Sequence, residues 1–133
     1  MRKLFAVLAL ALFLPGCAIF GEPVGQIAVP KDISEVGQQA ANAVNEAYVA
    51  LIAANNLIKS NVDAGIYTKE QAQRYLDRSK VARLKVDAAK AAFDATDYTS
   101  AVSQANITKT LLLALQREVA AQARKDAAQR STK

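Results

Sequence analysis

The fold is decided by residues 68–93, TKEQAQRYLDRSKVARLKVDAAKAAF, which have the spacing of a helix with one apolar side. Apolar and small residues recur there at alternating steps of three and four, which places them on one helix face. They are Ala72, Tyr75, Ser79, Ala82, Val86, Ala89 and Phe93. Thr68 followed by Gln71 matches a capping box, in which each side chain accepts a hydrogen bond from the other residue's backbone amide. The pattern predicts a helix over 68–93 whose seam packs nearly parallel or antiparallel to neighbouring helices.

A second seam with the same spacing follows a predicted turn at 94–97. The pattern indicates a helix over 98–129, with Asp97 or Thr99 as the residue that caps it. Its inward side chains are expected to be Ala101, Ala105, Thr108, Leu112, Leu115 and Val119. This helix is therefore predicted to pack against the helix over 68–93.

The run LLLAL at 111–115 is the most concentrated apolar patch of the two helices. It covers more than half of the helix circumference, so one neighbouring core cannot bury all of it. We expect three of its members in the core, with Leu111 or Leu113 near the surface. A partner-binding face is the alternative interpretation of this run.

A third helical stretch, 32–63, precedes these two. Asp32 with Glu35 matches a capping box, so we expect Asp32 to cap this helix. Its predicted seam consists of Val36, Ala40, Ala43, Val44, Ala47, Leu51, Ala54, Ile58 and Val62. Gly65 suits the left-handed conformation that closes many helices, and Ile66 is expected to pack back on the last turn.

Three helices of about 25 to 32 residues joined by short turns predict an all-α fold, an antiparallel three-helix bundle with long helices and coiled-coil packing. The bundle occupies 32–130 and is followed by a basic tail end at 131–133. The four tyrosines are expected to pack through their rings and to expose their hydroxyls, and a ligand groove is the alternative; they are Tyr48, Tyr67, Tyr75 and Tyr98. Tyr67 and Tyr98 are placed at the turns, as end plugs. Alanine-rich seams bury little area, and a homo-oligomer would add stability.

The composition excludes several kinds of catalytic site. The 133 residues include no histidine and a single cysteine, Cys17, so the commonest general base and most thiol chemistry are absent. We predict that the protein is not an enzyme and that it holds no metal. The net charge of +5 falls to about +3 without Arg2 and Lys3, a surplus that suits anionic lipid headgroups or an acidic envelope polymer. The cations are not interleaved with aromatic residues, so no nucleic-acid partner is expected.

The amino-terminal residues have the organisation of an export signal. A basic start leads into an apolar run over 4–14 that stops at Leu14-Pro15-Gly16-Cys17. The following segment, 17–31, contains prolines and glycines without a helical period, which predicts a flexible tether. An uncleaved membrane anchor over 4–20 is the alternative, and the Pro-Gly pair argues against it because it interrupts a helix.

Leu14-Pro15-Gly16-Cys17 resembles the lipobox of bacterial lipoproteins, with Pro15 where that family usually has a small or β-branched residue. The resemblance implies that Leu14 and Gly16 mark the cleavage site and that a signal peptide, 1–16, is removed before Cys17. It also implies that Cys17 carries a diacylglycerol and an N-acyl chain such as palmitate, with no other cofactor. Ala18, rather than Asp, after the cysteine implies sorting to the outer membrane, on its periplasmic face.

The carboxyl-terminal end carries four cations that are candidates for envelope contact, Arg124, Lys125, Arg130 and Lys133. An alanine-rich helical lipoprotein that ends in lysine resembles the major outer-membrane lipoprotein, which is joined to peptidoglycan through its last lysine. That family is a single continuous helix, whereas this sequence predicts two turns. Ionic contact with the wall is therefore expected, and covalent attachment through Lys133 is the alternative.

The overall layout also resembles small alanine-rich helical lipoproteins of unknown function from Gram-negative genomes and prophages. The sequence predicts a lipid-anchored periplasmic protein that acts by binding, as a cell-envelope structural or adaptor protein. Its expected partners are the membrane, through the lipid anchor, and peptidoglycan or another envelope protein. A phage- or prophage-encoded lipoprotein that blocks or modifies an outer-membrane receptor is the alternative.

Overall fold

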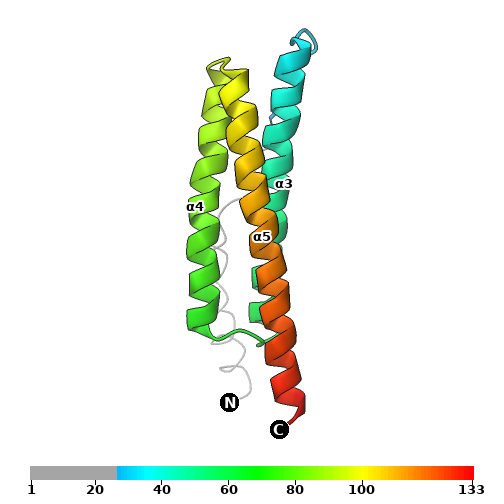
Figure 1. Cartoon of the computed structure of the whole chain (residues 1–133), viewed down its shortest axis with the longest axis vertical. Helices are drawn as coiled ribbons and strands as arrows, with labels where there is room; N and C mark the ends of the chain where they lie inside the picture. Colours follow the sequence, from blue (N-terminus) through cyan, green and yellow to red (C-terminus); the bar gives the residue numbers. More distant parts are fainter. Residues whose placement is uncertain (1–26) are drawn as a thin grey trace, which may run out of the picture.

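The computed structural model describes residues 27–133, which form three α-helices. They are α3 (Glu35–Asp63), α4 (Lys69–Asp94) and α5 (Tyr98–Ser131). Each helix packs against the other two, and the part of the chain described contains no strand (Figure 1). The predicted all-α fold of three long helices is therefore confirmed. The expected signal peptide lies outside the described residues.

Hydrogen bonds between the helices show in which direction each one runs. Residue numbers change in opposite senses across the α3–α4 and α4–α5 contacts, as in the pairs Tyr48 with Asp87, Asn55 with Ser79, Gln71 with Asp126, and Arg78 with Glu118. They rise together across the α3–α5 contact, in the pairs Glu46 with Lys109 and Ala50 with Gln116. The helix α4 thus runs opposite to α3 and α5, as Figure 1 shows by its colours.

The predicted seams form the core of the bundle. All seven predicted positions of α4 and all six of α5 are buried. Two seam positions of α3 were wrong, because Val36 and Val62 are exposed. Gly37 faces the core in place of Val36, and a Cβ there would lie 3.1 Å from Tyr98 Cζ and would overlap Ile33. The absent side chain of Gly37 therefore lets Ile33 and Tyr98 close this end of the bundle.

The helix ends follow the predicted capping chemistry with one correction. Asp32 does not cap α3, because the Ser34 hydroxyl accepts the hydrogen bond from the Gly37 amide, at 3.2 Å. The capping box of Thr68 with Gln71 is present. Asp97 caps α5 by accepting from the Ser100 amide. The serine lies immediately before the helix, whereas a cap at Asp32 would require two further residues in helical conformation.

The two turns share one backbone design with different residues. Gly65 has a positive φ of 65°, as predicted, and the amide of Ile66 reaches back to the carbonyl of Asn61 at 2.9 Å. In the second turn Thr96 has a positive φ of 62°, and the amide of Asp97 bonds the carbonyl of Ala92 at 2.9 Å. Both are Schellman motifs, but the second uses a β-branched residue in a conformation that favours glycine.

The tyrosines pack as expected through their rings, but two hydroxyls are not free in solvent. Tyr67 is buried at one end of the bundle, where its hydroxyl donates to the carbonyl of Val119 and its ring centre lies 5.4 Å from that of Tyr75. The Tyr48 hydroxyl donates to Asp87 Oδ1 at 2.9 Å. These two tyrosines therefore bond across the helix contacts, which corrects the expectation of exposed hydroxyls.

The apolar run of α5 is less buried than predicted. Only Leu112 and Leu115 of the run are buried, while both Leu111 and Leu113 are exposed. These two side chains lie on opposite sides of the seam, Leu111 at the groove with α4 and Leu113 at the groove with α3. The prediction of three buried members was wrong because each neighbouring helix covers only its own side of the seam.

Ile27 marks where the described chain meets the bundle. Its amide donates to Asn45 Oδ1 at 2.8 Å, and its carbonyl accepts from Asn45 Nδ2 at 3.2 Å. The Ile27 side chain is partly buried against the core. This end of the expected tether is therefore attached to α3 rather than free.

Candidate functional site

The predicted site residues fall into two groups. Those for cleavage and lipidation lie outside the described residues; they are Leu14, Gly16 and Cys17. The tail cations lie at the carboxyl-terminal end of α5 and are exposed; they are Arg124, Lys125, Arg130 and Lys133. Arg130 Nη2 donates to the carbonyl of Ile66 at 3.0 Å, which ties this end of α5 to the first turn. The other three cations form no ion pair within residues 27–133.

Charge is distributed unevenly among the three helices. The helix α3 carries three acidic residues and one lysine, a net charge of −2. The helix α4 carries seven cations and four acids, and α5 carries five cations and two acids, so each has a net charge of +3. The side of the bundle formed by α4 and α5 is therefore the basic side.

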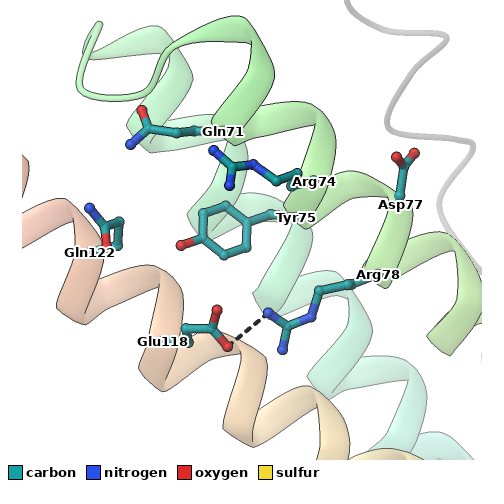
Figure 2. A pocket seen from close by; sticks show the side chains of 7 residues that line it. All are labelled: Gln71, Arg74, Tyr75, Asp77, Arg78, Glu118 and Gln122. Carbon is teal, nitrogen blue, oxygen red and sulfur yellow. Dashed lines mark hydrogen bonds and ion pairs between the residues drawn. The ribbon is translucent and has the colours of Figure 1, made fainter.

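A polar groove of about 650 Å³ lies between α4 and α5 (Figure 2). Its lining residues are Gln71, Arg74, Tyr75, Asp77, Arg78, Glu118 and Gln122. Figure 2 shows Arg74 and Tyr75 extending from α4 toward α5 and Asp77 pointing away. Burial raises the pKa of the Tyr75 hydroxyl, and the charge of Glu118 raises it further, so the hydroxyl stays a hydrogen-bond donor at neutral pH.

Bridges between α4 and α5 engage two of the three acids at this groove, whereas Asp77 bonds to Gln73 within α4. Arg78 Nη1 donates to Glu118 Oε2 at 2.7 Å. Asp126 accepts from Gln71 at 3.0 Å and from Gln122 at 2.8 Å. Two arginines thus face two carboxylates, so the groove has no strong preference for one sign of charge. Its chemistry suits a small polar group and does not by itself select a ligand.

An apolar surface lies farther along the same two helices. Four large side chains there, between 49% and 70% exposed, form what we name the aliphatic flank: Val81, Leu84, Ile107 and Leu111. Val81 and Leu111 line one groove of about 360 Å³ between α4 and α5. Leu84 follows Val81 by three residues and Ile107 precedes Leu111 by four, so both are neighbours on the helix surface.

The charged groups beside the aliphatic flank differ in their hydrogen bonds and ion pairs. Asp77 accepts a hydrogen bond from Gln73 at 2.7 Å. Asp87 accepts from Tyr48 and lies 4.0 Å from Arg83 Nε. Lys80 and Lys85, in contrast, form no ion pair with any described residue. Asp77 also forms no ion pair among the described residues, so two unpaired lysines and one unpaired carboxylate give this surface a net positive charge.

The other side of α5 carries a second apolar groove, of about 490 Å³, with α3. Val49 and Leu113 line it and are exposed. Lys109 pairs with Glu46 across it, and Gln116 donates to the carbonyl of Ala50 at 2.9 Å. In this groove the cation is paired, and side chains from α5 already connect the two helices.

The described residues offer little support for other kinds of site. No group of three or more histidine, cysteine, aspartate or glutamate residues within 27–133 is placed to hold a metal ion. None of the three helices α3, α4 and α5 is long and apolar enough to span a membrane.

Comparison with known proteins adds no assignment. The chain matches no protein-family model, no curated protein and no solved structure. The sequence pattern did not single out Val81, Leu84 or Ile107, although each is a large aliphatic residue outside its helix seam. Their position outside the seams was the feature of the sequence that could have indicated an exposed apolar surface.

Proposed function

We propose that the protein is a lipid-anchored lipoprotein on the periplasmic face of the outer membrane, where it acts by binding as a structural or adaptor protein. The anchor is supported by the apolar run that ends at Leu14-Pro15-Gly16-Cys17. Triple acylation of Cys17 would give stable attachment, because each buried methylene contributes about 0.8 kcal/mol.

The observation that carries a binding role is the concentration of cations on α4 and α5. Each of these helices has a net charge of +3, and several of their cations lack an acidic partner among the described residues. An elongated bundle with one basic side suits anionic partners such as lipid headgroups or wall polymers. The absence of histidine from the sequence favours binding over acid–base catalysis.

Contact with the cell wall is proposed for the end of α5. Arg124, Lys125 and Lys133 are exposed there and form no ion pair with described residues. A wall polymer with carboxylates would be attracted to these cations, with a strength that falls as salt is added. The contact requires no covalent bond to Lys133.

Replacement of Cys17 by serine tests the anchor. Without the thiol no diacylglycerol can be added, so Cys17→Ser should leave the membrane fraction or accumulate as an unprocessed precursor. Ala18→Asp is the matched control, because the lipobox resemblance implies continued acylation with retention in the inner membrane. Mature-size Cys17→Ser protein in the outer membrane would contradict the proposed function.

A further inference from the structure

The four side chains of the aliphatic flank belong neither to the core nor to the polar groove. Leu84 is 70% exposed, and the other three members of the flank are at least 49% exposed. Single exposed aliphatic residues are common, but four on adjoining faces of two helices form a patch of the kind that marks an interaction surface.

The charges around the flank select the kind of partner. Lys80 lies one helical turn before Leu84, and Lys85 lines the groove with Val81 and Leu111. Both lysines are free of ion pairs within the described chain, while the nearby Asp77 and Asp87 are hydrogen-bonded to other side chains. An apolar strip beside uncommitted lysines matches the interface of an anionic bilayer, where aliphatic groups enter and lysines reach the headgroups.

We propose that the aliphatic flank is a membrane-contact surface that lays α4 and α5 against a bilayer containing anionic headgroups. The inference rests on the proposed lipid anchor, which would hold the bundle next to a bilayer and raise the local lipid concentration that the flank meets. The α3 side, which has the net negative charge, then faces the periplasm. Contact through the flank is reversible, because four side chains cannot replace an anchor.

The test uses the full chain, purified from membranes and reconstituted into vesicles. An environment-sensitive fluorophore is attached through Leu84→Cys, and through Val49→Cys on the α3–α5 side as the matched control, since Val49 is 52% exposed. Vesicles of phosphatidylethanolamine are prepared with and without phosphatidylglycerol. Nitroxide groups on the acyl chains report insertion by quenching, flotation reports attachment, and the intact mass reports acylation and confirms that Cys17 carries no label.

The expected result is a blue shift and acyl-chain quenching of the label at position 84 in phosphatidylglycerol vesicles, with a water-like label at position 49. Exchange of Lys80 and Lys85 for glutamine should lower the ratio of docked to undocked protein by roughly fivefold for each lysine. Circular dichroism checks that the variants remain helical.

The other outcomes separate the contact surface from the anchor. Flotation without quenching at position 84 overturns the contact surface and leaves the anchor intact. Quenching at position 84 in a chain without acyl groups supports the contact surface and overturns the anchor, and failure to float overturns both. A blue shift without acyl-chain quenching that grows with protein concentration would assign the flank to a second copy of the chain and overturn the inference.

Discussion

The two surfaces that α5 forms with α3 and with α4 both expose aliphatic residues, but they differ in the pairing of the charged residues beside them. Toward α3, Lys109 and Gln116 reach across the groove to Glu46 and to the carbonyl of Ala50. Toward α4, Arg78 and Gln71 also reach Glu118 and Asp126, but farther along the helices the aliphatic flank stays exposed and Lys85 has no ion pair within the described residues. Both sides expose aliphatic residues, so exposure alone does not distinguish them. The two surfaces differ in whether the lysine beside the exposed aliphatic residues is paired, as Lys109 is, or lacks an ion pair among the described residues, as Lys85 does.

The largest expected effect compares two consecutive leucines of α5. Leu112 is fully buried where α5 meets its neighbours, so Leu112→Ala should lower the free energy of unfolding by about 2 to 5 kcal/mol. Leu111 lies half-exposed on the aliphatic flank, and Leu111→Ala should cost less than about 1 kcal/mol. Urea unfolding followed by circular dichroism measures both. Equal losses would show that the flank is part of the core.

The next effect tests the hydrogen bond between Tyr67, in the first turn, and Val119 of α5. The Tyr67 hydroxyl donates to the Val119 carbonyl, so Tyr67→Phe should cost about 0.5 to 1.5 kcal/mol, the net contribution of one hydrogen bond, because this carbonyl lies within α5 and keeps its helical amide partner. Burial raises the pKa of Tyr67 to about 12 in the folded protein. Because the folded state holds this proton more tightly, its contribution to stability is complete below about pH 10 and is lost as the pH rises through about 12.

Denaturant unfolding at about pH 9 and about pH 11.5 checks the direction of this dependence. The wild type should lose more stability between the two values than Tyr67→Phe, which has no phenolic proton at that position. Tyr98→Phe at the opposite end is the control for removal of a tyrosine hydroxyl. Identical pH slopes for the wild type and Tyr67→Phe would contradict the assigned bond.

A smaller effect comes from the two turns that set the position of α4 beside α5. Thr96 has a left-handed backbone conformation that costs a β-branched residue energy, so Thr96→Gly should stabilise the protein by about 1 kcal/mol. Gly65→Ala should destabilise it by about 1 kcal/mol, because no atom lies within 4 Å of the added Cβ and only the backbone conformation opposes it. Thermal unfolding gives both signs, and a loss for Thr96→Gly would indicate a contact by the threonine side chain.

The smallest expected effects concern the charges that distinguish the two sides of α5. Lys109→Gln removes an exposed ion pair and should cost about 0 to 1 kcal/mol, with a smaller loss in high salt. Lys85→Gln removes a charge without a partner in the described chain, so stability should change by less than about 0.5 kcal/mol. Unfolding in low and high salt measures both. A clear, salt-dependent loss for Lys85→Gln would show that this lysine belongs to the fold.

The sequence predicted those parts of the fold that depend on local spacing. The inward positions of α4 and α5 and the caps at Thr68 and Asp97 follow from helical periodicity and short-range hydrogen bonds. The start of α3 was missed because both Asp32 and Ser34 are good capping residues. Ser34 is the cap where Ile33 packs beside Gly37 and Tyr98 of α5 approaches the same glycine, and the approach of Tyr98 is a tertiary contact that local spacing does not predict.

The candidate surfaces were harder to predict, for a physical reason. Periodicity indicates which residues face the core. Whether a residue outside the seam is buried or exposed depends on how closely the neighbouring helices pack beside it, which the spacing does not show. Leu84 lies between Arg83 and Lys85 in the sequence, so its local surroundings give no sign of an apolar surface. Likewise, the left-handed Gly65 was predictable from its residue type, whereas Thr96 adopts that conformation because the turn requires it.

The most direct test of the proposed account is the intact mass of the protein extracted from membranes after lysozyme digestion of the cell wall. We expect a chain that begins at Cys17, carries added acyl chains and has no muropeptide on Lys133. A muropeptide would replace ionic contact with covalent attachment. An unmodified full-length mass would contradict the lipid anchor and favour an uncleaved membrane segment over residues 4–20.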